Sequence, residues 1–143
     1  MRNGLAGIYS LLMLAFAVPA LAHHSFAPYE DELQITFTGT VTDFQWTNPH
    51  IYIEMDAKDE TGTTRRWLIE CANTTILNRI GWKWNMIKVG DEISVIVAPL
   101  RNGEPAALLK RVRLPDGTEH GNGGPAGPAT ITFDGLPLPP DQQ

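Results

Sequence analysis

The histidines are the residues whose types and positions point most directly to chemistry. His23 and His24 are adjacent near the N-terminus, and His50 closes a Trp-Thr-Asn-Pro-His segment. If an export signal is removed after Ala22, the α-amino group and imidazole of His23 can chelate one metal ion. Amine and imidazole nitrogens suit Cu(II), which also leads the affinity order of the divalent first-row ions. The three histidines therefore predict a metal site for copper or zinc, provided that the N-terminal arm folds back to His50. The alternative is that all three are ordinary arm and turn residues.

Aromatic residues indicate a second kind of site, a surface for a ligand. Small β-barrels bind extended ligands on faces lined by such side chains. Two candidates share the corner with His50 and two follow the predicted helix. They are Trp46, Asn48, Trp82 and Trp84. We expect Trp82 and Trp84 to be exposed; the alternative for the aromatic residues is core and corner packing.

Motifs of catalysis are missing from the chain. There is no Ser-His-acid pattern with local motif support and no glycine loop that would bind phosphate. Glu70 has apolar neighbours on its predicted strand, so we expect a partly buried carboxylate paired with Arg66 or Arg79. A binding protein is therefore favoured over an enzyme, although a metal-dependent enzyme using the same histidines stays open.

The first 22 residues have the pattern of a cleaved export signal. Arg2 supplies a positive charge, residues 8–18 are apolar, and Ala20-Leu21-Ala22 is a small-x-small cleavage site. The apolar run is short for a bilayer span. We therefore predict a periplasmic or secreted protein without a membrane anchor after cleavage.

The charge balance bears on the partners. Removing 22 of 143 residues leaves 121, and the loss of Arg2 takes the formal net charge from −5 to −6. An acidic, exported protein is a poor match for a phosphate backbone, so we predict no nucleic-acid partner. A small ligand, a metal ion or an envelope protein is expected instead.

Alternating apolar and polar residues predict a mainly β domain. The alternation slips at Asp43, which indicates a bulge in a long first strand, and Gly39 fits a bend there. Asn73 or Thr74 can cap a short helix that ends near Gly81. The expected strands are 33–46, 51–57, 63–71, 92–98 and 106–114. Five strands with one helix between the third and fourth predict a small OB-like barrel.

The domain organisation follows from the same patterns. We predict a signal segment at 1–22, an arm at 23–32 with Phe26 and Tyr29 as anchors, and the barrel at 33–117. Residues 118–143 are dominated by Gly and Pro, so they are predicted to be a flexible tail.

Several motifs together resemble a family of small exported bacterial proteins of unknown function. They are a mature start of His-His-Ser-Phe, the Trp46-Thr47-Asn48-Pro49-His50 corner, Trp67 with Glu70, Gly81-Trp82 and Gly90-Asp91-Glu92. The resemblance covers residues 23–117 and implies an exported single domain. It implies no activity.

The leading hypothesis is a periplasmic barrel that binds a small ligand, metal or protein through the corner and the arm. A metal-dependent enzyme and a structural subunit of the cell envelope are the alternatives.

Overall fold

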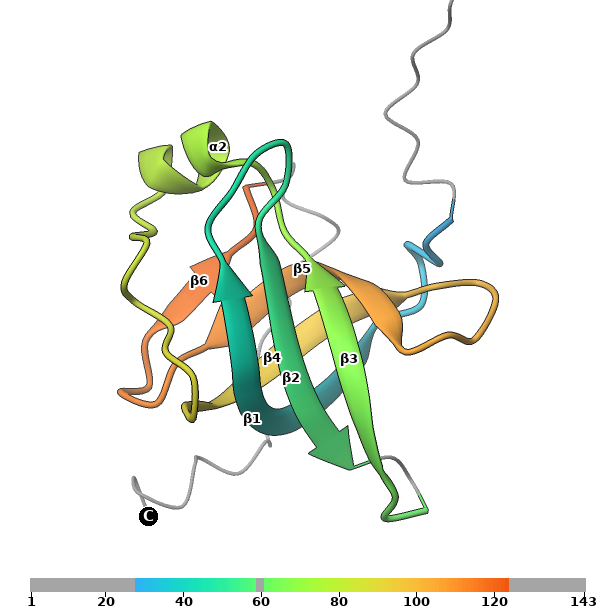
Figure 1. The fold of residues 1–143 in the computed structure, drawn as a ribbon. Coiled ribbons are helices and arrows are strands. Elements are labelled where there is room, and N and C mark those ends of the chain that lie inside the picture. Colours follow the sequence, from blue (N-terminus) through green and yellow to red (C-terminus); the bar gives the residue numbers. More distant parts are fainter. Residues whose placement is uncertain (1–27, 59–60, 124–143) are drawn as a thin grey trace, which may run out of the picture.

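A six-stranded sheet that curls on itself organises the chain (Figure 1). The computed structural model describes residues 28–58 and 61–123. In chain order the elements are β1 (Ile35–Gln45), β2 (Tyr52–Lys58), β3 (Thr64–Glu70), α2 (Thr74–Arg79), β4 (Glu92–Pro99), β5 (Ala106–Arg113) and β6 (Glu119–Gly121). The strand order is β3-β2-β1-β4-β5-β6, and a parallel β3–β5 pairing closes the first five strands into a barrel. The predicted mainly β fold, a five-stranded barrel with one short helix after the third strand, is confirmed.

Strand β1 turns the corner that makes closure possible. Its first half, from Ile35 to Thr40, pairs with β4, and its second half, from Gly39 to Gln45, pairs with β2. The register with β2 shifts between Val41 and Asp43, where the sequence pattern slips. The predicted bulge is therefore confirmed, and it lets one strand serve two sides of the barrel.

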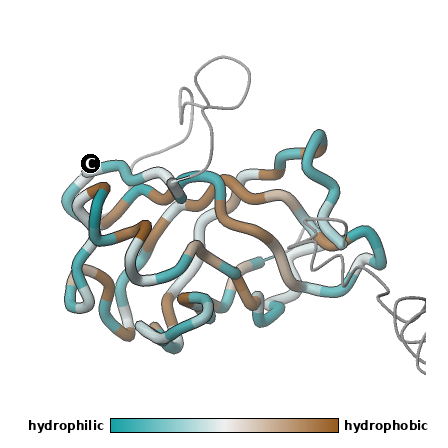
Figure 2. Tube along the Cα trace, turned by 90° about the horizontal axis from the view of Figure 1, so that it is seen from above, coloured by the Kyte–Doolittle hydropathy of each residue, from teal (hydrophilic) through white to brown (hydrophobic). Residues whose placement is uncertain are grey.

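The barrel interior is apolar, and Figure 2 shows hydrophobic stretches alternating with hydrophilic ones along the chain. The strand alternation and the apolar stripe of the helix together predict twelve core positions. Ten of them are buried, and the other two, Ile35 and Phe37, are partly exposed at the start of β1. The ten are Val41, Ile51, Ile53, Ile69, Leu77, Ile93, Val95, Val97, Leu108 and Val112.

Helix α2 lies beside the β1–β2 connection at one end of the barrel (Figure 1). Asn73 caps it, because its side chain accepts a hydrogen bond from the backbone N–H of Ile76 at 2.9 Å. Leu77 points into the core and is fully buried. Among the described residues, no helix has the length and apolar character needed to cross a bilayer.

The predicted boundary between barrel and tail is too early. Strand β6 pairs with β5, and the side chain of Asn122 accepts from the Ala72 N–H at 2.7 Å and donates to the Leu109 carbonyl at 2.9 Å. The Gly- and Pro-rich composition gave no sign of this ordered segment, because hydrogen bonds to backbone groups distant in sequence stabilise it. The rest of the predicted tail lies outside the described residues.

The close approach of β1 to β2 at Gly39 yields a stability prediction. A Cβ there would lie 2.5 Å from the Asp56 carbonyl oxygen, 2.7 Å from the Met55 methyl and 2.9 Å from the Ala57 Cβ. We expect Gly39→Ala to reduce the free energy of unfolding by about 1–3 kcal/mol through overpacking, measured by denaturant unfolding. Gly121→Ala is the matched control, because a Cβ there meets no atom within 4 Å. An equal effect of the two substitutions would contradict the packing account.

Candidate functional site

Glu70, at the end of β3, connects two other side chains that the sequence separates widely. Its Oε2 accepts a hydrogen bond from the Tyr29 hydroxyl at 2.6 Å, and its Oε1 contacts the Nδ1 of His50. Both oxygens of the carboxylate are therefore used. We call Tyr29, His50 and Glu70 the Glu70 network.

Backbone pairing brings His50 and Glu70 together. The Cys71 N–H donates to the Ile51 carbonyl at 2.8 Å, which continues the β2–β3 ladder by one step beyond the Tyr52–Glu70 pair. His50 immediately precedes this step, so its imidazole lies beside the carboxylate. The corner between β1 and β2 thus positions the His50 imidazole, and the end of β3 positions the Glu70 carboxylate.

The N-terminal arm positions Tyr29 through contacts with the end of β4. Tyr29 forms an isolated β-bridge with Leu100, and the Glu30 N–H donates to the Pro99 carbonyl at 2.8 Å. Arg101 donates its backbone N–H to the Pro28 carbonyl at 3.0 Å. The arm therefore follows the β4–β5 connection, and it is held there by backbone bonds before Tyr29 reaches Glu70.

The electrostatics of the network favour two donors around one acceptor. Burial, and then the hydrogen bond to Glu70, raise the pKa of the Tyr29 phenol, so Tyr29 keeps its proton at neutral pH. A carboxylate only accepts hydrogen bonds, so the His50 Nδ1 that contacts it carries a proton. The other imidazole nitrogen, Nε2, is then left to act as an acceptor or a metal ligand. The side chain of His50 is 35% exposed, so solvent reaches the ring.

The predicted partner of Glu70 is wrong. Arg66 instead contacts Asp56 on the neighbouring strand, with Nε 2.9 Å from Oδ1, and it lowers the pKa of that carboxyl. The reason is geometric: Arg66 faces Asp56 across the antiparallel ladder, whereas Glu70 faces Tyr52. Arg79 lies in the last turn of α2.

Only one of the three predicted metal ligands lies within the residues that the structure describes. His50 is described and belongs to the Glu70 network, whereas His23 and His24 lie outside the described residues. Within residues 28–58 and 61–123, no group of three or more His, Cys, Asp or Glu side chains could hold a metal ion. A metal site therefore stays a prediction that needs the arm histidines.

The predicted ligand contacts have different surroundings. Trp46 is half-buried and packs edge-on against Phe44, with ring centroids 5.9 Å apart. The Asn48 side chain accepts from the Thr74 hydroxyl at 2.9 Å, so it fastens the corner to α2. A ligand-binding role for either residue stays a prediction.

The two tryptophans after the helix differ sharply in exposure. Trp84 is 70% exposed, as expected, but the expected exposure of Trp82 is wrong, because this residue is fully buried. Its Nε1 donates to the Gly121 carbonyl at 3.0 Å, and its ring meets the edge of His120. The acceptor belongs to β6, which the sequence pattern did not predict, so the burial of Trp82 could not be anticipated.

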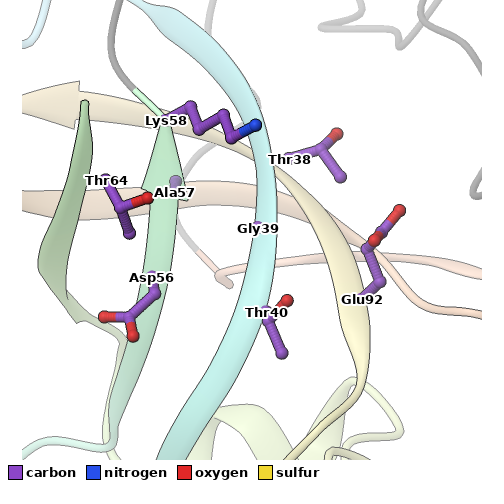
Figure 3. A pocket seen from close by; sticks show the side chains of 8 residues that line it. All are labelled: Thr38, Gly39, Thr40, Asp56, Ala57, Lys58, Thr64 and Glu92. Carbon is purple, nitrogen blue, oxygen red and sulfur yellow. The ribbon is translucent and has the colours of Figure 1, made fainter. Parts of the chain in front are cut away.

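A hollow of about 340 Å³ lies at the bend of β1, between strands β1 to β4 (Figure 3). Threonines line it together with Lys58, Asp56 and Glu92. Along β2, Ala57 in this hollow is five positions, or about 17 Å, from Tyr52, where the strand leaves the His50 corner. None of the Glu70 network lines this hollow, so it is a separate feature.

Tyr29 is the site residue whose role the sequence did not reveal. It was predicted only as an anchor of the arm, and its partner Glu70 lies 41 residues away. A tyrosine in an arm otherwise rich in polar residues was the available signal. It indicated contact with the barrel but not the acceptor.

The Tyr29–Glu70 bond yields a pH-dependent stability prediction. The pKa of Tyr29 is raised above its unfolded value of about 10, so its contribution is complete below that pH and is lost as pH rises further. Tyr29→Phe should cost about 1–2 kcal/mol at neutral pH and should make stability fall less steeply above pH ~10. Denaturant unfolding across this pH range measures both effects.

Tyr52→Phe is the control for that experiment. The pKa of Tyr52 is also raised, mainly by burial, but the substitution leaves the Tyr29–Glu70 bond in place. A loss at neutral pH as large as that of Tyr29→Phe would show that the hydrogen bond contributes nothing specific.

Comparisons with solved structures add two similarities. Both are crystal structures of the mitochondrial single-stranded DNA binding protein Rim1 from S. cerevisiae, the second labelled with selenomethionine. The first is 13% identical, with a TM-score of 0.42, over 57% of this chain and 93% of that one. The second is 15% identical, with a TM-score of 0.38, over 57% and 92%. Similarity at this level does not assign a ligand to this chain.

The prediction that the chain has no nucleic-acid partner is not kept, because single-stranded DNA binding proteins are among the similar structures. Its physical weakness is that net charge describes the whole chain, whereas binding depends on the charge and the aromatic residues of one face.

Comparison with known sequences gives a family but no characterised relative. None of the curated proteins is a match to this chain. A family described as "Family of unknown function (DUF6152)" matches residues 11–109, which is more than half of the chain. The chain belongs to this family of unknown function.

Proposed function

We propose that this protein is an exported β-barrel module that binds a metal ion, Cu(II) by preference, at the His50 corner. His50 would supply one imidazole, and the N-terminal histidines, His23 and His24, would supply the remaining nitrogens. The observation that carries the proposal is the contact between His50 Nδ1 and Glu70 Oε1.

That contact supports metal binding for a chemical reason. A metal-bound histidine almost always donates its other ring N–H to a carboxylate, a carbonyl or water, which fixes the ring and makes the ligating nitrogen more basic. Glu70 is in position to do this for His50, and the Tyr29 hydroxyl holds the second carboxylate oxygen. The imidazole is therefore oriented before any ion arrives.

Chain connectivity supports the participation of the arm. Tyr29 is part of the Glu70 network, and His24 precedes it by five residues, which span at most about 18 Å when extended. His24 is therefore kept within this chain length of Tyr29, which shares the Glu70 carboxylate with His50, the predicted ligand on the barrel. If the signal is removed after Ala22, the free amine of His23 adds a donor that suits Cu(II).

The proposal predicts a strict dependence on processing. A chain that begins at His23 should bind Cu(II) more tightly than one that keeps Ala22, because the extra residue moves the free amine away from the His23 imidazole. Isothermal calorimetry on both chains measures the difference. Binding should weaken as pH falls, since protons compete for the same nitrogens.

Substitutions separate the roles of the barrel and the arm. His50→Ala should weaken binding, and Glu70→Gln should weaken it by about 10–100-fold through loss of the supporting carboxylate. His120→Ala is the matched control, because this histidine packs on Trp82 instead. Equal affinities for the two N-terminal forms, or no effect of His50→Ala, would eliminate the proposed site.

A further inference from the structure

One segment of the barrel surface holds most of the exposed large hydrophobic side chains. Six such side chains are exposed within the described residues, and four of them lie between residues 76 and 89. The four are Ile76, Ile80, Trp84 and Val89. Single exposed apolar residues are ordinary, but a concentration of them marks an interaction surface.

The exposed side chains project from a well-anchored segment. Leu77, Trp82 and Ile87 alternate with them along the chain and are buried in the core. A local hydrogen bond also fixes the end of the segment, since the Lys88 N–H donates to the Asp91 carboxylate at 2.8 Å. The outward direction of Trp84 and Val89 is therefore imposed by the buried residues on either side.

The same segment is basic in an acidic protein. Residues 76–90 contain Arg79, Lys83 and Lys88 and no Asp or Glu, whereas the whole chain has a formal net charge of −5. All three basic residues are exposed. Asp91, the next acid along the chain, accepts the Lys88 N–H, and Glu92 begins β4. Apolar and cationic side chains thus share one stretch of surface.

This stretch runs along the outside of the barrel. In Figure 1 the connection from α2 to β4 passes down one side of the molecule, outside the sheet. Between α2 and β4 it forms no strand and takes no part in the β-ladders, and at its helical end Gly123 lies against Ile76 and Ile80.

We infer that residues 76–90 form an interfacial anchor that docks on an anionic lipid surface. Tryptophan favours the membrane–water interface, and aliphatic side chains beside it bury their area among the acyl chains. Each lysine or arginine near an anionic leaflet adds further attraction. This inference is independent of the proposed metal site, because it uses none of the same residues.

Vesicle binding tests the inference directly. The chain from His23 to Gln143 is used, because the predicted signal segment would itself bind lipid. It should cosediment with vesicles of mixed phosphatidylcholine and phosphatidylglycerol, and its tryptophan fluorescence should shift to the blue. Binding to vesicles of phosphatidylcholine alone should be much weaker, and added salt should reduce binding to the mixed vesicles.

Paired variants assign the binding to this segment. Trp84→Ser should lower the partition coefficient about fivefold or more, and the double variant Lys83→Glu with Lys88→Glu should lower it about tenfold or more. Leu68→Ser and Arg65→Glu are the matched controls, because they change an exposed aliphatic and an exposed cationic residue on β3. Both controls should bind as the unchanged chain does.

Three outcomes would overturn the inference. They are no binding to the mixed vesicles, equal binding to the neutral vesicles, and binding that survives the Trp84 and lysine substitutions. A concentration-dependent dimer that Trp84→Ser abolishes, without any effect on vesicle binding, would reassign the surface to a second copy of the chain. Unfolding curves of each variant confirm that the fold is retained.

Discussion

The carboxylate of Glu70 is the interaction on which the candidate site depends. It is mostly buried, with 21% of the side chain exposed, and each oxygen has its own partner. A buried carboxylate is costly unless hydrogen bonds replace its hydration. Tyr29 and His50 therefore stabilise the carboxylate, and the carboxylate in turn orients their side chains. Three segments distant in sequence, the arm, the corner and the end of β3, are held at one place by this group.

The barrel makes that meeting possible because β1 serves two sides of it. The bulge after Val41 and the close approach at Gly39 turn the strand, so that it pairs with β2 along one half and with β4 along the other in one closed sheet. Closure through the β3–β5 pairing brings the end of β3 next to the β4–β5 connection, along which the arm runs. The same topology leaves the connection from α2 to β4 outside the sheet, where Trp84, Val89 and the two lysines are exposed while Trp82 and Ile87 pack into the core.

Local pattern was sufficient for most of the fold and insufficient for most of the site. Alternation, the slip at Asp43 and the cap at Asn73 act over a few residues, so they could be recognised in the sequence. The Tyr29–Glu70 bond spans 41 residues and depends on closure of the barrel, which no local pattern encodes. Trp82 was misjudged for the same reason, since the carbonyl that accepts its indole N–H belongs to β6, within a stretch of low apolar content.

The protonation of His50 tests the central claim most directly. If Glu70 accepts from Nδ1, the neutral imidazole carries its proton on Nδ1 and leaves Nε2 bare, whichever ion or ligand is bound later. Nitrogen-15 NMR of labelled histidine distinguishes the two tautomers. The account predicts the Nδ1–H form in the unchanged chain, together with a shift toward the other tautomer in Glu70→Ala, which removes the acceptor. An Nε2–H form in the unchanged chain, or a tautomer that Glu70→Ala leaves unaltered, would contradict it.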